Sequence, residues 1–382
     1  MEQEMVAQLT CPHCNSSLEV SSLKTVRIRY RYDKTTRDEI KEGTLICKSC
    51  GNKFVIKHFI PSFLQSELVD NELLGEGTFW GQYYSFLNSK GITNFMDIQN
   101  PFAPLYRFGI LEKVSPKERE QIQKLKLQDV RILQNDESSR LIYNRVINGH
   151  LGKRSNVLEV GCGSGWLSLE LKRKGFDVVG LDPSFSCLKM AKNYAISKGI
   201  HIEYIHADAA LSIFKTGIFD AVFAFHSLHH VKDFDKVVKN IRLWLRQEGI
   251  IAIYEHRRAL SSLNLIKRLI YLFFFPVLSA RYNHDKQVLS FFLSLQRGKS
   301  PAEDTAVHQI DRLAENFAVV ERDLFFHLLD EIPCLTYYAL GRNLKALEKT
   351  ACVIDLLQGR LKIAFPDKAE FVLCIGFNRL AD

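Results

Sequence analysis

The stretch NVLEVGCGSGWLSLELKRKGFDVVGLDPS at residues 156–184 decides the fold of this chain. It opens with a short apolar run at 156–160 and then carries three glycines at alternate positions. Apolar residues recur at helical spacing over 166–174, and a second apolar run at 177–181 ends in Asp182. This order of strand, glycine turn, helix and strand is typical of a doubly wound α/β fold.

The glycine turn also predicts a nucleoside site. Gly161, Gly163 and Gly165 carry no side chains, so a ligand can approach the backbone at the positive end of the following helix. Asp182, at the end of the second strand, is placed to accept hydrogen bonds from a ribose. The G-x-G-x-G spacing differs from the dinucleotide fingerprint. The carboxylate of Glu159 suits a ligand with a cationic amine and a sulfonium, whereas it would repel a pyrophosphate.

The stretch resembles motifs I and II of the class I S-adenosylmethionine (SAM)-dependent methyltransferases, and the resemblance extends over about 135–257. It implies an α/β fold with a doubly wound, seven-stranded Rossmann-like sheet. It further implies that Glu159 holds the amino end of SAM, that Asp208 accepts the adenine amine and that Ala209 offers its backbone N–H to the ring. The residues that it assigns to the cofactor are Glu159, Gly161, Cys162, Gly163, Gly165, Asp182, Pro183, Asp208, Ala209 and Phe225. The alternatives are a glycine bend without a ligand and a nicotinamide-dependent enzyme, which the glycine spacing disfavours.

Three histidines follow the predicted fourth strand at 219–225 and are the candidate catalytic residues: His226, His229 and His230. The carboxyl end of a central parallel strand is where doubly wound folds bind ligands. The Leu-His-His sequence resembles methyltransferases of the quinone-methylating type, in which this segment lines the substrate side. A histidine there can act as general base for an oxygen nucleophile, and the alternative is that it only packs in the turn. The Asn/Asp-Pro-Pro-aromatic motif of nucleic-acid N-methyltransferases is absent after this strand, which argues against methylation of DNA at adenine or at cytosine N4.

Two C-x-x-C pairs near the N-terminus predict a metal site formed by Cys11, Cys14, Cys47 and Cys50. Four thiolates at tetrahedral geometry form a closed structural zinc site, and a redox disulfide is the alternative. The segment from Leu9 to Leu64 resembles the Trm112-like zinc ribbon that precedes or activates some methyltransferases. Its role is open among a cap on the active site, a docking surface for substrate and a stabilising appendage.

These patterns divide the chain into a zinc ribbon at 1–64, a linker or cap at 65–134 and a methyltransferase domain at 135–382. The last domain carries helical additions at about 258–316 and 330–366. Around them we expect an amphipathic helix over 233–248, a fifth strand over 250–254, a sixth over 317–326 and a seventh over 371–377. Two residues directly after the fifth strand, Glu255 and His256, are candidate substrate contacts.

Composition sets broad limits on the class of protein. Hydrophobic content of 46% and charged content of 25% are ordinary for a globular protein, and the net charge of +8 permits an RNA or acidic-membrane partner without requiring one. No apolar run reaches the roughly 18 residues that span a bilayer, and no signal peptide is expected. Nine cysteines suggest a reducing cytoplasm. The apolar face of a helix expected at 261–276 is compatible with peripheral membrane contact, a substrate tunnel or a buried lid.

The sequence therefore predicts a cytoplasmic SAM-dependent methyltransferase that uses structural zinc and modifies a small or lipid-like acceptor. The first alternative is an RNA base methyltransferase in which the ribbon holds the substrate, and the row Arg27, Arg29 and Arg31 is the sequence feature that favours it. The second alternative is a scaffold protein that keeps the fold but transfers no methyl group. Methyl transfer needs little from side chains beyond alignment and exclusion of water, which explains why cofactor residues are easier to predict than catalytic ones.

Overall fold

A computed structural model describes residues 1–64, 151–152, 154–225, 227–228, 231–256, 312–325 and 371–379. The cap predicted at 65–134, the addition at 330–366 and nearly all of the addition at 258–316 lie outside these residues. The three candidate catalytic histidines also lie outside them. No helix among the described residues is long and apolar enough to span a membrane.

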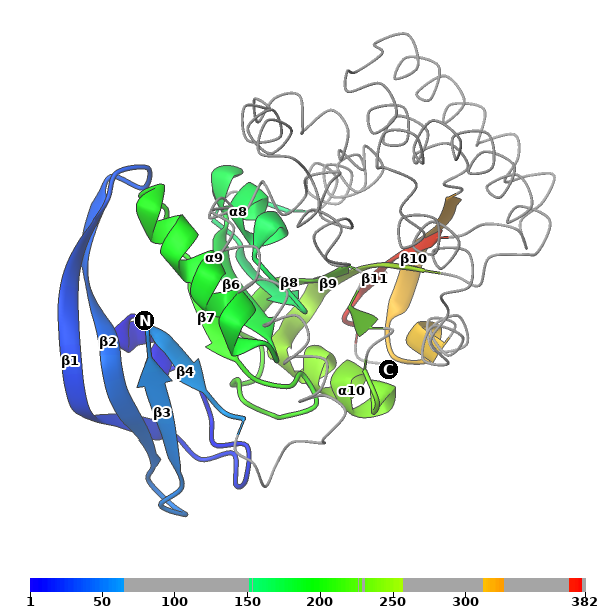
Figure 1. Cartoon of the computed structure of the whole chain (residues 1–382). Coiled ribbons are helices and arrows are strands. Elements are labelled where there is room, and N and C mark those ends of the chain that lie inside the picture. Colours follow the sequence, from blue (N-terminus) through cyan, green and yellow to red (C-terminus); the bar gives the residue numbers. More distant parts are fainter. Residues whose placement is uncertain are drawn as a thin grey trace, which may run out of the picture.

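One continuous sheet runs through the described residues (Figure 1), with the strand order β1-β2-β3-β4-β7-β6-β5-β8-β9-β11-β10. Strands β7, β6, β5, β8 and β9 run parallel, and β11 pairs antiparallel with both β9 and β10. This is the doubly wound arrangement that the glycine stretch predicts. The bounds of these strands are β5 Asn156–Val160, β6 Asp177–Asp182, β7 Glu203–His206, β8 Phe219–Phe225, β9 Leu245–His256, β10 Ala318–Phe325 and β11 Phe371–Phe377.

Helices connect the parallel strands, and their bounds are α8 Trp166–Arg173, α9 Phe185–Ser197 and α10 Phe234–Trp244. A short helix α1 spans Gln3–Val6, and a 3-10 turn η4 spans Arg312–Glu315. The carboxylate of Asp233 caps α10 by accepting the backbone N–H of Lys236 at 3.0 Å.

Helix α10 ends four residues earlier than the amphipathic pattern over 233–248 predicts. The reason is that the backbone of Leu245 is extended and pairs with Phe219 at the start of β8. The chain therefore enters β9 before Gly249, and Glu248 takes a φ of 60° inside that strand. Pairing with the neighbouring strand overrides the helical periodicity here.

The N-terminal ribbon is built from β1 Leu18–Tyr30, β2 Thr35–Cys47, β3 Lys53–Lys57 and β4 Ile60–Ser62. Each of these strands is antiparallel to the next, and β4 then lies parallel to β7 with Ser62 opposite His206. In Figure 1 the blue ribbon accordingly continues the green sheet at its β7 edge. The sequence pattern does not predict this junction.

The ribbon and the α/β unit also share one apolar core. A single cluster of buried side chains includes Leu9, Phe54 and Phe63 from the ribbon together with two residues of the α/β unit, Phe214 between β7 and β8 and Trp244 at the end of α10. The rings of Phe214 and Trp244 meet edge to face at a centroid distance of 5.0 Å. The ribbon is thus packed onto the α/β unit through a shared core.

Candidate functional site

The bend between β5 and α8 is formed by three glycines with positive φ, at 71° for Gly161, 51° for Gly163 and 76° for Gly165. A Cβ on Gly161 would lie 2.3 Å from the Cβ of Ser227, and one on Gly165 would lie 2.5 Å from the hydroxyl of Tyr204. These two positions therefore require glycine for close packing as well as for backbone conformation. No described atom lies within 4 Å of a Cβ built on Gly163, so the middle of the bend faces open space.

Asp182 lies beside this bend, at the end of β6. One carboxylate oxygen accepts the backbone N–H of Gly163 at 2.7 Å, and the other accepts the backbone N–H of Ser184 at 2.8 Å. The backbone N–H groups of Gly161 and Cys162 in turn donate to the carbonyl of Leu181 at 2.8 and 3.1 Å. The bend and the turn after β6 are thus held together as one unit.

Glu159 occupies β5 two residues before the bend and is buried. Its carboxyl group accepts a hydrogen bond from the hydroxyl of Ser168 in α8. Burial raises the pKa of Glu159 to about 8, and the hydrogen bonds from Ser168 act in the opposite direction. This carboxyl group therefore carries a proton over much of the neutral pH range, and a cation brought beside it would favour its ionised form.

Asp208 and Ala209 follow the end of β7, at the same carboxyl edge of the sheet. The side chain of Asp208 accepts the backbone N–H of Ala210 at 2.8 Å, and Asn240 in α10 donates to the carbonyl of Ala209 at 2.9 Å. The loop is therefore fixed from both sides. Asp208 is half-buried and Ala209 is buried.

The remaining assigned residues have different surroundings. The sulfur of Cys162 would lie 2.8 Å from a Cβ on Gly180, so this buried side chain packs against β6 and only its backbone belongs to the bend. Burial raises the pKa of its thiol. Phe225, at the end of β8, packs edge to face on Tyr254 at 5.7 Å. Pro183 lies between Asp182 and Ser184 in the turn after β6.

Glu255 has partners that the sequence pattern does not predict. Its side chain is fully buried, and one carboxylate oxygen accepts the backbone N–H groups of Ser227 and Leu228 at 2.7 and 2.6 Å. Glu255 therefore holds the turn after β8, and its contact with a substrate stays a prediction. In the sequence, Glu255 is a charged residue directly after an apolar strand. That pattern indicates the edge of a sheet, but it does not predict which groups the carboxylate binds.

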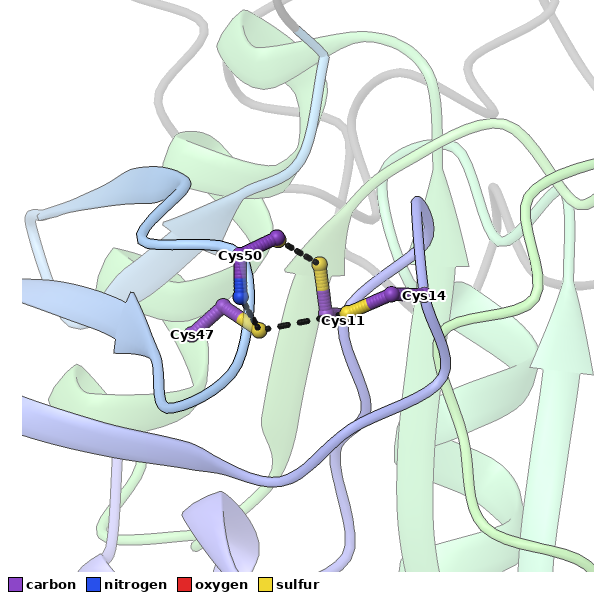
Figure 2. A group of neighbouring side chains, drawn as sticks. All are labelled: Cys11, Cys14, Cys47 and Cys50. Atoms are coloured by element: carbon purple, nitrogen blue, oxygen red, sulfur yellow. Dashed lines mark hydrogen bonds between the residues drawn. The ribbon is translucent and has the colours of Figure 1, made fainter.

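The four cysteines of the two C-x-x-C pairs converge in the ribbon (Figure 2) and lie with all four sulfurs within 4.8 Å of one another. The sulfur of Cys11 lies 3.6 Å from that of Cys50, and the sulfur of Cys14 lies 3.4 Å from that of Cys47. A tetrahedral zinc site with Zn–S bonds of about 2.3 Å has sulfur–sulfur edges of about 3.8 Å. The donor set therefore fits one structural Zn²⁺.

The two C-x-x-C turns, at Cys11–Cys14 and Cys47–Cys50, are the zinc knuckles of the ribbon, and each is closed by the same backbone hydrogen bond. The N–H of Asn15 donates to the carbonyl of Cys11 at 2.8 Å, and the N–H of Gly51 donates to the carbonyl of Cys47 at 3.1 Å. Both donors have positive φ, at 56° and 73°. Burial raises the pKa of Cys11 to about 12, whereas hydrogen bonds from Ser16 lower the pKa of Cys14 to about 6. A bound Zn²⁺ would replace the proton on Cys11, because zinc binds thiolates.

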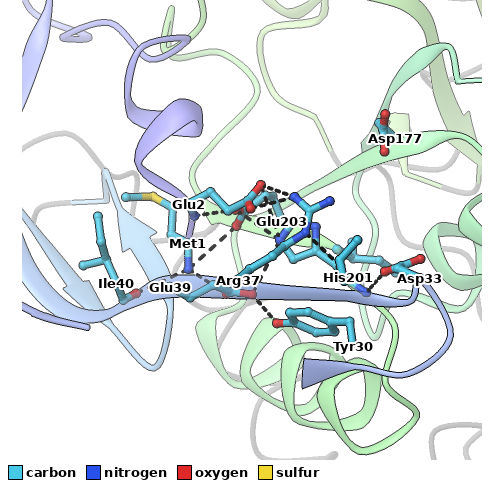
Figure 3. A network of polar contacts seen from close by, with 12 residues as sticks. Met1, Glu2, Tyr30, Asp33, Arg37, Glu39, Ile40, Asp177, His201 and Glu203 are labelled. Carbon is cyan, nitrogen blue, oxygen red and sulfur yellow. Dashed lines mark hydrogen bonds and ion pairs between the residues drawn. The ribbon is translucent and has the colours of Figure 1, made fainter. Parts of the chain in front are cut away.

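A buried polar network joins the ribbon to the parallel sheet (Figure 3). Lys192 in α9 donates to Glu39 in β2 at 2.8 Å, and the Met1 ammonium lies 2.9 Å from the same carboxylate oxygen of Glu39. His201 Nε2 lies 3.5 to 3.8 Å from carboxylate oxygens of Glu39, Glu203 and Glu2. The Lys192, Met1 and Arg37 cations balance these three carboxylates.

Two family descriptions match the chain at the segments that form these sites. Residues 158–253 match the description "Methyltransferase domain", and residues 7–58 match "Trm112p-like protein". The chain carries a class I SAM-dependent methyltransferase domain behind a Trm112-like segment. Both resemblances expected from the sequence are confirmed.

Curated relatives match the chain over part of their length. A ubiquinone biosynthesis O-methyltransferase of Pectobacterium atrosepticum is 37% identical over 97 residues, which are 24% of this chain and 37% of the relative. The protein of the same name from an Escherichia coli strain is 39% identical over 92 residues, 24% of this chain and 38% of the relative. The chain thus spans little more than a third of the length of these relatives.

Among solved structures, the [4+2]-cyclase SpnF superimposes with a TM-score of 0.43 at 15% identity, covering 65% of this chain and 84% of that one. Phosphoethanolamine N-methyltransferase 2 of Haemonchus contortus, solved in complex with SAM, superimposes with a TM-score of 0.42 at 18% identity, covering 65% and 55%.

Proposed function

We propose that this chain binds SAM at the carboxyl edge of β5, β6 and β7 and transfers its methyl group to a small-molecule acceptor. The observation that carries the proposal is the coupling of Asp182 to the glycine bend. Its carboxylate accepts the N–H of Gly163, and none of the described residues places an atom within 4 Å of a Cβ built on Gly163. A ligand lying on the bend would therefore meet the carboxylate that is expected to take its ribose.

Glu159 supports a cationic ligand over a phosphate. Its carboxyl group lies in β5 just before the bend, and it is neutral or negative but never positive. The ammonium group of SAM would stabilise the ionised form, whereas a pyrophosphate would be repelled by it. Asp208 and Ala209 lie at the same edge and would receive the adenine.

The expected reaction is a direct displacement. An acceptor atom forms a bond to the methyl carbon as the carbon–sulfur bond breaks, and the electron pair stays on sulfur to give S-adenosylhomocysteine. The acceptor loses its proton to solvent or to a base, for which the histidines after β8 remain our prediction. The backbone N–H groups of Ser227 and Leu228, which lie between these histidines in the sequence, are held by Glu255.

A small acceptor is favoured by the relatives, whose names describe methylation of an oxygen atom in ubiquinone biosynthesis. The family match at 158–253 includes the strands that would bind SAM, so it supports the transfer chemistry more than the identity of the acceptor. The RNA alternative rests on the arginine row in β1. In that row Arg27 forms two 2.8 Å hydrogen bonds to Asp38, which reduces the positive charge available to a phosphate backbone.

Calorimetric titration of the full chain with SAM and S-adenosylhomocysteine tests the proposal. We expect binding by the wild type and a loss of affinity of about 100-fold in Asp182→Ala, since a hydrogen-bonded carboxylate contributes on the order of 3 kcal/mol. Asp177→Ala is the matched control, because Asp177 begins the same strand at its opposite end. A wild-type protein that binds neither compound would refute the enzyme and leave the scaffold alternative. Salt-sensitive retention on RNA would instead favour the RNA alternative.

A further inference from the structure

His206, the last residue of β7, connects the ribbon to the turn that carries Asp182. Its Nδ1 lies 2.7 Å from the hydroxyl of Ser62 in β4, and its Nε2 lies 2.9 Å from the carbonyl oxygen of Pro183. Ser62 and His206 are 144 residues apart in the sequence and are brought opposite each other by the β4–β7 pairing. One imidazole ring therefore spans from the ribbon to the proposed ribose turn.

The chemistry of the two partners fixes the direction of both hydrogen bonds. The Pro183 carbonyl can only accept, so His206 Nε2 must carry the proton. His206 Nδ1 is then the acceptor in the neutral ring, and the Ser62 hydroxyl donates to it. Burial lowers the pKa of His206 to about 4, so the ring keeps this neutral state near pH 7.

The backbone reinforces the same connection. The N–H of Phe63 donates to the carbonyl of His206 at 2.9 Å, and the N–H of Ala207 donates to the carbonyl of Asp182 at 3.2 Å. The ring of His206 also packs edge to face on Phe185 at the start of α9, at a centroid distance of 5.4 Å. His206 is thereby held in place on three sides, and its Nε2–H is directed at the turn after β6.

Residues next to the first zinc knuckle form backbone hydrogen bonds with the end of the loop that carries Asp208. The N–H of Thr10, next to Cys11, donates to the carbonyl of Ile213 at 2.8 Å, and the N–H of Lys215 donates to the carbonyl of Gln8 at 2.9 Å. The loop from His206 to Ile213 is therefore bounded at both ends by hydrogen bonds to the ribbon. Asp208 and Ala209 lie between these two attachments.

We propose that Ser62 and His206 are positioning residues of the cofactor site. The Ser62 hydroxyl orients the His206 ring, and the ring holds the Pro183 carbonyl so that Asp182 faces the glycine bend. This inference rests on the proposed function, because the site that it positions is the SAM site. It gives the ribbon a specific role in which the strand at its exit forms part of the support of the cofactor pocket.

The test compares three variants of the full, zinc-loaded chain. Ser62→Ala removes the donor to His206, and Ser62→Thr retains a hydroxyl at the same place. Ser21→Ala is the control, because Ser21 is another half-buried serine of the ribbon and its hydroxyl donates to the Thr44 carbonyl. We expect SAM affinity to fall about 3- to 10-fold in Ser62→Ala, the range of one net hydrogen bond, and to stay near the wild-type value in the other two.

A second measurement determines which nitrogen of the His206 imidazole carries the proton. In nitrogen-15 spectra of the wild type, the His206 imidazole should show the tautomer protonated at Nε2, and Ser62→Ala should broaden this signal or mix the two tautomers. Zinc content and circular dichroism verify that each variant is folded. If Ser62→Ala leaves both SAM affinity and the His206 tautomer unchanged, or if wild-type His206 carries its proton on Nδ1, the inference is wrong. A wild type that shows the Nε2–H tautomer but binds no SAM would overturn the proposed function, and with it any role in positioning the cofactor.

Discussion

The ribbon and the parallel sheet share hydrogen bonds across one edge, yet they are held together by different forces. Apart from the exposed Asn156, which begins β5, the central strands β5 and β8 are mostly buried and consist of Val, Leu, Ala and Phe with one acidic residue each. By contrast, β1 of the ribbon exposes most of its side chains. The ribbon is held by its four cysteines and by the buried ion pair between Glu39 of β2 and Lys192 of α9. Apolar packing stabilises both regions, and we expect the ribbon to depend in addition on a metal and on charges that must stay paired.

Removal of zinc is the strongest way to test this contrast. Structural zinc contributes on the order of 10 kcal/mol to the folding of small zinc modules, so a chelator or Cys47→Ser should unfold the ribbon. Hydrogen exchange should then show β1 and β2 losing protection while β5 and β8 largely keep it. Cys374→Ser is the control, because Cys374 lies in β11, near the end of the sheet that is away from the ribbon. Equal loss of protection in both regions would mean that the two regions fold as one unit.

Breaking the buried ion pair should have the next largest effect. Lys192 is 1% exposed and also donates to the Ile202 carbonyl at 2.9 Å, so Lys192→Met leaves Glu39 charged and buried. We expect a loss of about 3–5 kcal/mol in chemical denaturation, and less when Glu39→Gln is added. Lys198→Met on the exposed end of α9 serves as the comparison. A loss below about 1 kcal/mol for Lys192→Met would show that the junction does not depend on this pair.

Glu159 provides a pH-dependent test inside the parallel sheet. Its pKa is raised from 4.5 to about 8, so the unfolded chain ionises first and the folded state should lose stability as pH rises between these values. Glu159→Gln cannot ionise, and its stability relative to the wild type should grow by a few kcal/mol from about pH 5 to pH 8. Denaturant midpoints at several pH values measure this. A constant difference between the two proteins would contradict the buried, protonated state.

The exposed pair of Arg27 and Asp38 should matter least. Their side chains are 74% and 56% exposed, and water and salt screen such a pair. Arg27→Ala is therefore expected to leave the unfolding midpoint and SAM affinity within experimental error. A clear loss of RNA retention in the same variant, measured at low and moderate salt, would instead give the arginine row a functional role.

Local pattern was sufficient for much of the parallel sheet. The apolar run at 219–225 predicts β8 with its observed bounds, and the glycine spacing predicts the bend because positive φ at these positions needs glycine. The two C-x-x-C pairs likewise predict a four-sulfur site that the fold does bring together. The sequence pattern gave the wrong end of α10, because long-range strand pairing decides the backbone there. Leu245 begins β9 and pairs with Phe219 of β8 instead of extending the helix.

Taken alone, the sequence determined the elements whose signal is local: strand, glycine bend and helix around residues 156–184, and the metal-binding cysteines. Tertiary structure alone decided that β4 would extend the sheet at β7, that Glu255 would bind two backbone N–H groups, and that Ser62 would meet His206. The physical reason is that periodicity and backbone preference act between near neighbours, whereas a serine and a histidine 144 residues apart have no common signal until two strands pair.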